Sequence, residues 1–246
     1  MTGYRRSVTV MGTVATVELY DAPDAERLAD EVFAWLREVD RRFSTYRAGS
    51  DVNRLHRGEL TLAECAPEVS EVLARCAEFW RDTDGYFDVY ATGRLDPSGY
   101  VKGWSVQVAS ERLFAAGAVN HLVDAGGDIQ TRGRPAPDAR WEIGIRHPWH
   151  PASVCAVVTG TDLAVATSGT YERGCHVVDP RTGRPRGDLR SVTVVGRDLG
   201  TADVYATAAV AMGPPALRWL AGLDGYESMV VTEEGVSYRS AGLPVA

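Results

Sequence analysis

The sequence predicts an α+β fold, in which a mixed, largely antiparallel sheet packs against helices. Helical periodicities gather in the first half of the chain, and short alternating segments dominate the second half. No regular βαβ alternation joins them, which argues against a Rossmann-type sheet. With 246 residues, 45% of them hydrophobic, the chain can bury a sizeable core, and we expect one domain over residues 1–246.

The first elements follow from hydrophobic spacing. Residues 5–20 alternate as a strand, with a turn about Gly12. A helix is predicted after Pro23–Asp24, and a second one ends near Thr83–Asp84–Gly85, where glycine suits a C-cap. A polar connection that includes the turn Ala48–Asp51 separates them. The apolar stripes of the two helices are Leu28, Val32, Trp35, Leu36, Val39 and Phe43, and Val69, Val72, Leu73, Cys76, Phe79 and Trp80.

The remaining elements begin with a third helix, predicted over about 102–116, whose N-terminal end could face an anion. Strands are expected at about 121–124, 128–132, 141–146, 154–159, 163–166, 175–178 and 190–195. Helices follow at about 202–213 and 215–222, and strands at 227–232 and 235–239.

Composition excludes several classes of protein. The formal net charge of −7 disfavours a nucleic-acid binder. None of the four cysteines forms a CxxC pair, which disfavours a zinc knuckle. Free thiols are favoured, although the spacing of Cys65 and Cys76 allows a disulfide. No apolar run approaches the roughly 20 residues of a membrane-spanning helix. We therefore expect no stable membrane anchor.

The segment TADVYATAAVAMG places Asp203 and Thr207 four residues apart in a predicted helix. Residues at this spacing share a helix face, here expected to be exposed. A carboxylate and a hydroxyl with no histidine or cysteine beside them offer the hard oxygen ligands that Mg²⁺ prefers. Taken alone, such a pair is more often part of a solvated face.

Two glycine-containing motifs lie upstream. VDAGGDI places two glycines before Asp128, which suits either close approach of a ligand or simply a tight turn. It is neither GxGxxG nor a P-loop. In DPSGYVKGW, Lys102 is a candidate phosphate-binding charge or a solvated side chain. Gly99 has no side chain to obstruct its carbonyl, which is therefore a candidate to complete a Mg²⁺ shell.

The motif HVVDPRTG contains a histidine with two interpretations. His176 is a candidate general base near neutral pH or a hydrogen-bonded core histidine. The following residues, Asp179 to Gly183, are typical of a β-turn with proline at its second position.

Taken in order, these motifs resemble the ApbE family, the FAD:protein FMN transferases. The resemblance runs from Met11 to about Gly213 and is carried by FSTY, GYFD, DPSGYVKG, VDAGGDI, WEIGIRHP, ATSGTYER, HVVDPRTG and TADVYATA. It implies a flavin cleft, FAD as substrate and Mg²⁺ as cofactor. Members transfer FMN from FAD to a Ser or Thr hydroxyl of an acceptor flavoprotein and release AMP, and some hydrolyse FAD to FMN and AMP.

The resemblance also assigns expected roles. The metal ligands would be Gly99, through its carbonyl, Asp203 and Thr207, with the Ala206 carbonyl as a further ligand. His176 matches the family histidine that activates the acceptor hydroxyl. The positions that match FAD contacts are Met11, Tyr46, Tyr86, Phe87, Asp88, Asp96, Lys102 and Val178, and those in motifs near the site are Asp128, Ser168 and Arg173.

Two departures from the family pattern bear on function. Tyr100 stands before Lys102 where the family usually has small apolar residues, which implies a changed pocket. Many relatives are exported lipoproteins, whereas the N-terminal residues here alternate as a strand. We therefore expect an unprocessed, cytoplasmic protein. The alternatives to transfer are an FAD pyrophosphatase with water as acceptor and a non-catalytic flavin-binding protein.

Overall fold

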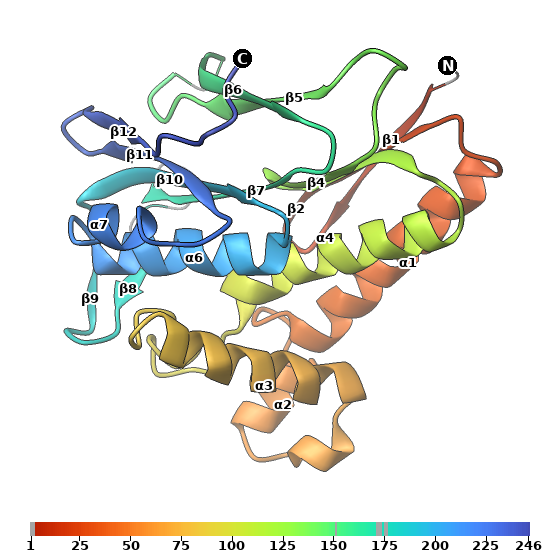
Figure 1. Ribbon diagram of the computed structural model, residues 1–246. Helices are drawn as coiled ribbons and strands as arrows, with labels where there is room; N and C mark the ends of the chain where they lie inside the picture. Colours follow the sequence, from red (N-terminus) through yellow and green to blue (C-terminus); the bar gives the residue numbers. More distant parts are fainter. Residues whose placement is uncertain (1–2, 151, 171–173, 175–176) are drawn as a thin grey trace.

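Eight strands form one sheet in the order β1-β2-β3-β4-β7-β10-β11-β12, and every neighbouring pair is antiparallel (Figure 1). The computed structural model describes residues 3–150, 152–170, 174 and 177–246. Helices α4 and α6 cover one face of the sheet, and the β5–β6 hairpin covers the other (Figure 1). The α+β fold predicted from the sequence is confirmed.

The strands of the main sheet are β1 (Gly3–Val10), β2 (Thr13–Tyr20), β3 (Asn120–Ala125), β4 (Asp128–Arg132), β7 (Ala164–Gly169), β10 (Leu189–Gly196), β11 (Glu227–Thr232) and β12 (Ser237–Arg239). Two hairpins stand outside it: β5 (Trp141–Arg146) with β6 (Val154–Gly160), and β8 (Val178–Asp179) with β9 (Arg184–Pro185). The helices are α1 (Ala25–Phe43), α2 (Asp51–His56), α3 (Pro67–Asp82), α4 (Ser98–Ala115), α6 (Leu199–Met212) and α7 (Ala216–Leu220), with a 3₁₀ turn at Leu62–Glu64.

Helix α6 is apolar on nearly all sides because it packs on β7 and β10 of the sheet and is also covered by α4 and α7. The two helices approach closely at Gly103. A Cβ atom there would lie 2.6 Å from the Leu199 carbonyl oxygen and 2.8 Å from the Cβ of Asp203. Only glycine fits this crossing, which therefore sets Asp203 directly against the backbone of α4.

Helix α1 buries the apolar stripe predicted from its spacing, from Leu28 to Phe43. Trp35 of α1 contacts α4 in two ways. Its indole Nε1–H donates to the Ser105 carbonyl at 2.9 Å, and its ring packs edge-to-face against Trp104. Helices α2 and α3 form a further layer beyond α1 and α4 (Figure 1). Residues 83–97 then connect the end of α3 to the start of α4.

The second face of the sheet has its own small core. Strand β5 alternates buried and exposed residues, as expected for a hairpin that packs on one side only. Ile143 and Ile145 pack there with Val165, Val195 and other buried apolar residues. The hairpin thus stabilises the sheet from the side opposite to α4 and α6.

Three sequence predictions differ from the structure. Helix α4 begins at Ser98 rather than at about Lys102. The polar connection contains the short helix α2, whose N-cap Ser50 accepts a hydrogen bond from the Asn53 amide at 3.3 Å. Of the strand predicted at 175–178, residues 175–176 lie outside the described residues, and β8 begins at Val178.

Within the described part of the chain, Cys65, Cys76 and Cys155 are free thiols, as predicted. Burial raises the pKa of the Cys76 thiol to about 12, so this group is protonated and unreactive at neutral pH. Over the same residues, no helix is both long and apolar enough to cross a bilayer. The cytoplasmic location stays a prediction.

A buried histidine ties β3 to α4 and makes stability depend on pH. The Nδ1–H of His121 donates to the Ala118 carbonyl at 2.6 Å, so Nε2 accepts from the Ser110 hydroxyl at 2.7 Å. Burial lowers the pKa of His121 from 6.5 to about 4. Because the folded pKa is depressed, this group contributes stability above pH 6.5 that is lost as the pH falls toward 4.

We expect the unfolding free energy of the wild type to fall by roughly 3 kcal/mol between these pH values, relative to a His121→Gln variant in which this contribution is absent. Urea unfolding measured at pH values from 7 to about 4 tests this. The matched control is His56→Gln, which changes an exposed histidine and should keep the wild-type slope. An unchanged slope in His121→Gln would contradict the assignment.

Candidate functional site

The predicted metal ligand Asp203 is buried rather than on an exposed face of α6, and Thr207 is half-buried. Asp203 is only 2% exposed, and its Oδ2 accepts the backbone N–H of Gly103 at 3.0 Å. The expectation of a solvent-facing carboxylate was wrong, because this side of α6 packs against α4 where the two helices cross at Gly103. Spacing along a helix shows which residues share a face, but not whether that face is covered.

Lys102 lies between Asp203 and a second buried carboxylate, Asp128. Its ammonium forms an ion pair with Asp128 and lies 3.9 Å from Oδ1 of Asp203. The Lys102 side chain is 25% exposed, whereas those of Asp128 and Asp203 are 0% and 2% exposed. The interpretation of Lys102 as a fully solvated side chain is therefore wrong.

This arrangement sets two buried carboxylates against one ammonium. Burial raises the pKa of Asp203 well above its usual value, and the neighbouring Asp128 raises it further. A buried carboxylate of this kind is stabilised by additional positive charge. A divalent cation bound beside Asp203 would supply such a charge.

Thr207 lies close to Gly99 at the start of α4. The Thr207 hydroxyl lies 3.1 Å from the Ser168 hydroxyl of β7. A Cβ atom at Gly99 would lie 3.3 Å from Thr207 Oγ1 and 3.1 Å from the Phe87 ring, so the backbone of α4 comes close to Thr207. Carboxylate, hydroxyl and carbonyl oxygens are the donors that Mg²⁺ prefers, and these residues fit that ion.

Within the described residues, the candidate metal site is not a cluster of carboxylate and imidazole side chains. Among the residues that the structure describes, no three His, Cys, Asp or Glu side chains come together as a metal site. The candidate set instead combines one carboxylate with a hydroxyl and backbone carbonyls.

The VDAGGDI motif forms the tight turn between β3 and β4. Gly126 and Gly127 have φ angles of +64° and +91°, which glycine adopts readily. The Gly127 amide donates to Asp124 Oδ1 at 2.8 Å, and a Cβ atom at Gly126 would lie 2.5 Å from Thr13 Oγ1. The turn places Asp128 at the first position of β4, where Lys102 reaches it.

Asp124 was not among the predicted site residues, although its carboxyl interacts with the charges of Asp128 and Lys102. Burial raises the pKa of this carboxyl, and the nearby Asp128 raises it further. The available signal was its place in the same motif, three residues before the second glycine.

Several predicted FAD contacts lie on the segment between α3 and α4. Phe87 is buried, and its amide donates to Thr83 Oγ1 at 3.0 Å. Asp88 Oδ1 accepts from the Tyr90 amide at 2.7 Å, and Asp96 Oδ1 accepts from the Ser98 amide at 3.0 Å. Both carboxylates therefore stabilise local turns. The segment leads directly to Gly99, in the first turn of α4.

The remaining predicted residues are more dispersed. Met11 occupies the β1–β2 turn with φ of 53°, and its sulfur lies 3.9 Å from Ser105 Oγ on α4. Tyr46 is 92% exposed, and the described contacts do not join it to the α4–α6 cluster. Val178 begins β8. His176 and Arg173 lie outside the described residues.

A groove of about 480 Å³ lies elsewhere, lined by α1, α3 and α4 residues such as Trp35, Glu38 and Arg112. It contains none of the predicted site residues. The candidate site is thus defined by converging polar groups rather than by this hollow.

The sequence is similar to a known protein family over most of its length. The ApbE family profile matches residues 11–93 and 90–230. An FAD:protein FMN transferase from Vibrio cholerae is 36% identical over 129 residues, which are 48% of this chain and 39% of that protein. One from Haemophilus influenzae is 24% identical over 272 residues, 82% of this chain and 79% of that protein.

Solved structures show the same fold. The apo form of the flavinyl transferase ApbE from Pseudomonas stutzeri has a TM-score of 0.85 and 26% identity, with coverage of 100% of this chain and 97% of that chain. An ApbE protein from Thermotoga maritima has a TM-score of 0.88 at 23% identity, with coverage of 98% and 97%. The second likeness concerns the fold alone.

Proposed function

The chain belongs to the ApbE family, and on that premise we propose that it is a Mg²⁺-dependent FAD:protein FMN transferase whose domain spans residues 1–246. Its FAD substrate would be split at the pyrophosphate, with FMN passed to a Ser or Thr hydroxyl of an acceptor flavoprotein. The observation that carries the proposal is the cluster at the α4–α6 crossing. There Lys102 lies between the buried carboxylates of Asp128 and Asp203, and Thr207 of α6 lies close to Gly99 of α4.

The transfer involves no change of oxidation state and needs no oxidant or reductant. The acceptor oxygen forms a bond to the phosphorus on the FMN side, the bond from that phosphorus to the bridging oxygen breaks, and AMP leaves. The acceptor proton would pass to His176, as the family resemblance implies. Bound Mg²⁺ would supply charge neutralisation at the pyrophosphate.

The chain's own residues would prepare this step. Asp203, Thr207 and the carbonyls of Gly99 and Ala206 would hold the ion. The close crossing at Gly103 keeps Asp203 fixed, because its Oδ2 already accepts a backbone amide at 3.0 Å. Preorganised groups of this kind need little rearrangement during phosphoryl transfer.

The sequence composition supports a special role for Lys102. The chain has 26 lysine and arginine residues, and Lys102 is its only lysine, so 25 are arginines. An ammonium is a compact point charge, whereas a guanidinium is planar and larger. The site between Asp128 and Asp203 therefore favours lysine in a chain that otherwise uses arginine.

Lys102→Arg and Lys102→Met should both impair the protein. Lys102→Met leaves two buried carboxylates without their ammonium, and we expect the unfolding free energy to fall by about 2–4 kcal/mol in the absence of metal. Lys102→Arg should retain part of this stability but lose most activity, because the planar group does not fit the same space. Urea unfolding and FMN transfer assays measure the two effects. Full activity in Lys102→Arg would contradict this role.

Product analysis distinguishes transfer from its alternatives. Purified protein is incubated with FAD, Mg²⁺ and a proteome from the same source, and flavin fluorescence of protein bands is followed together with AMP. Transfer yields labelled protein and AMP, a pyrophosphatase yields free FMN and AMP, and a binding protein leaves FAD intact. FMN replaces FAD in the matched control. It lacks the AMP leaving group and should label nothing.

A further inference from the structure

The β8–β9 hairpin has a tightly organised tip that carries Arg181. Asp179 is 2% exposed, and its carbonyl accepts the amides of Thr182 and Gly183 at 3.2 and 2.8 Å. Its carboxylate accepts the Arg181 amide at 2.9 Å and pairs with Arg186 at 3.1 Å. The backbone of Arg181 is therefore well fixed, and its side chain leaves from a rigid turn.

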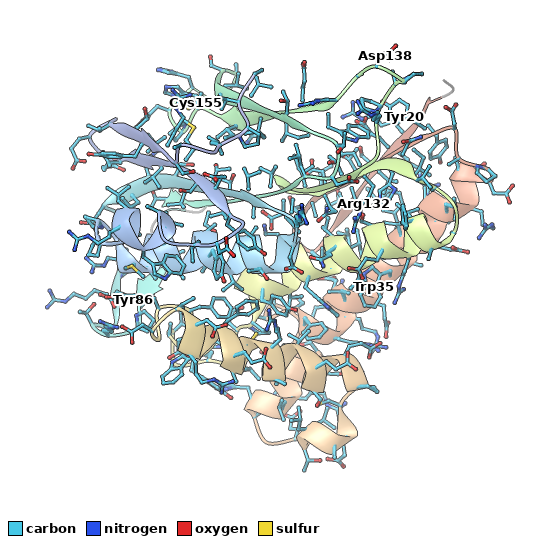
Figure 2. All side chains as sticks on the ribbon, in the orientation of Figure 1. Tyr20, Trp35, Tyr86, Arg132, Asp138 and Cys155 are labelled. Atoms are coloured by element: carbon cyan, nitrogen blue, oxygen red, sulfur yellow. The ribbon has the colours of Figure 1, made fainter. Side chains whose placement is uncertain are left out.

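That side chain makes three contacts with one distant turn. Its Nη2 donates to the Asp84 carbonyl at 2.9 Å and to the Asp84 carboxylate, and its guanidinium carbon lies 4.2 Å from the centre of the Tyr86 ring. The two segments are 97 residues apart in sequence. Figure 2 shows Tyr86 near the place where the hairpin approaches the end of α3.

The contacted turn leads directly to the candidate site. The Tyr86 amide donates to the Thr83 carbonyl at 3.1 Å, and the next residue, Phe87, is buried beside Gly99. Asp84 has φ of +53°, a left-handed conformation that aspartate adopts more readily than most other residues. A contact that holds this turn in place therefore also holds the residues that pack on Gly99.

The contacts are too exposed to serve the stability of the whole fold. The side chains of Arg181 and Asp84 are 49% and 89% exposed, and ion pairs in water contribute little to global stability. Stacking of a guanidinium on an aromatic ring adds a modest, local attraction. Such contacts are strong enough to restrain a turn.

We propose that Arg181 is a positioning residue, which clasps the turn Asp84–Asp88 to the β8–β9 hairpin and so sets the affinity for FAD. The inference rests on the proposed function in one respect, since Tyr86 and Val178 are expected FAD contacts on the two clasped segments. Arg181 itself acts through Asp84 and Tyr86, not on the reacting atoms.

The clasp is tested first without any ligand. In the full chain, Arg181→Ala should raise amide hydrogen exchange in residues 84–88 by roughly three- to tenfold, while the thermal midpoint stays close to that of the wild type. Arg181→Lys keeps the charge but loses the planar stack, and should fall between the two. The matched control is Arg27→Ala, which removes another exposed ion pair, with Glu31 at 2.6 Å. Unchanged exchange at residues 84–88 would overturn the clasp.

FAD binding gives the second readout. With Mg²⁺ present, Arg181→Ala should weaken FAD binding, followed by flavin fluorescence, by roughly three- to tenfold and leave kcat at saturating FAD within about twofold. Asp84→Asn removes the paired charge but tolerates the left-handed backbone, and its effect should not add to that of Arg181→Ala. Additive effects, or a loss confined to kcat, would overturn the positioning role.

The two proposals fail in different ways. If the wild type neither binds FAD nor transfers FMN, the proposed function fails, and the exchange experiment still decides whether the clasp exists. If the wild type transfers FMN and Arg181→Ala binds FAD as tightly as Arg27→Ala does, the positioning role fails alone.

Discussion

Asp203→Asn is expected to abolish most Mg²⁺-dependent turnover while the protein stays folded. The amide is nearly isosteric, and its oxygen can still accept the Gly103 N–H that Asp203 Oδ2 accepts at 3.0 Å. It cannot supply the negative charge that a hard divalent cation prefers. We expect a loss of at least about 100-fold in turnover, since changing a group that only supports a metal ligand already costs 10- to 100-fold.

Turnover of FAD is measured over a range of Mg²⁺ concentrations, with circular dichroism to confirm the fold. The matched control is Asp224→Asn, which alters an exposed carboxylate in the loop after α7. Asp203→Ala is a less clean test, because it leaves the buried Gly103 amide unpaired and should also destabilise the protein by about 1–3 kcal/mol. Unchanged Mg²⁺-dependent turnover in folded Asp203→Asn would remove Asp203 from the metal site.

His176→Asn should lower the rate of FMN transfer by roughly 10²–10⁴-fold, the usual contribution of a general base. The expectation rests on the match of HVVDPRTG to the family motif, since His176 lies outside the described residues. FAD affinity should change far less, because a base acts on the acceptor proton rather than on FAD. Single-turnover rates and FAD titrations of the same preparation measure the two quantities.

The outcomes for His176 separate three roles. Parallel losses of affinity and rate would make it a binding residue. Full activity would support the alternative of a hydrogen-bonded core histidine. His56→Asn, at an exposed position on α2, controls for the loss of an imidazole elsewhere.

Much of the fold was predictable because local patterns report local structure. The apolar stripe from Leu28 to Phe43 occupies one buried face of α1, as its spacing indicated. The alternation in β5 likewise matches a strand buried on one side. Helix α2 was missed because six residues with a serine cap carry too little periodicity to stand out from a polar loop.

The candidate site, like the fold, was predictable only in its local features. The order and spacing of residues along the chain predict Asp203 and Thr207 on one helix face and glycines at tight turns. The packing of distant elements, by contrast, buries Asp203, sets Lys102 between it and Asp128, and brings Arg181 to Asp84. The reason is that periodicity records neighbours within one element, whereas burial and charge pairing depend on which elements pack together. That information is spread over contacts as distant as the 100 residues between Gly103 and Asp203.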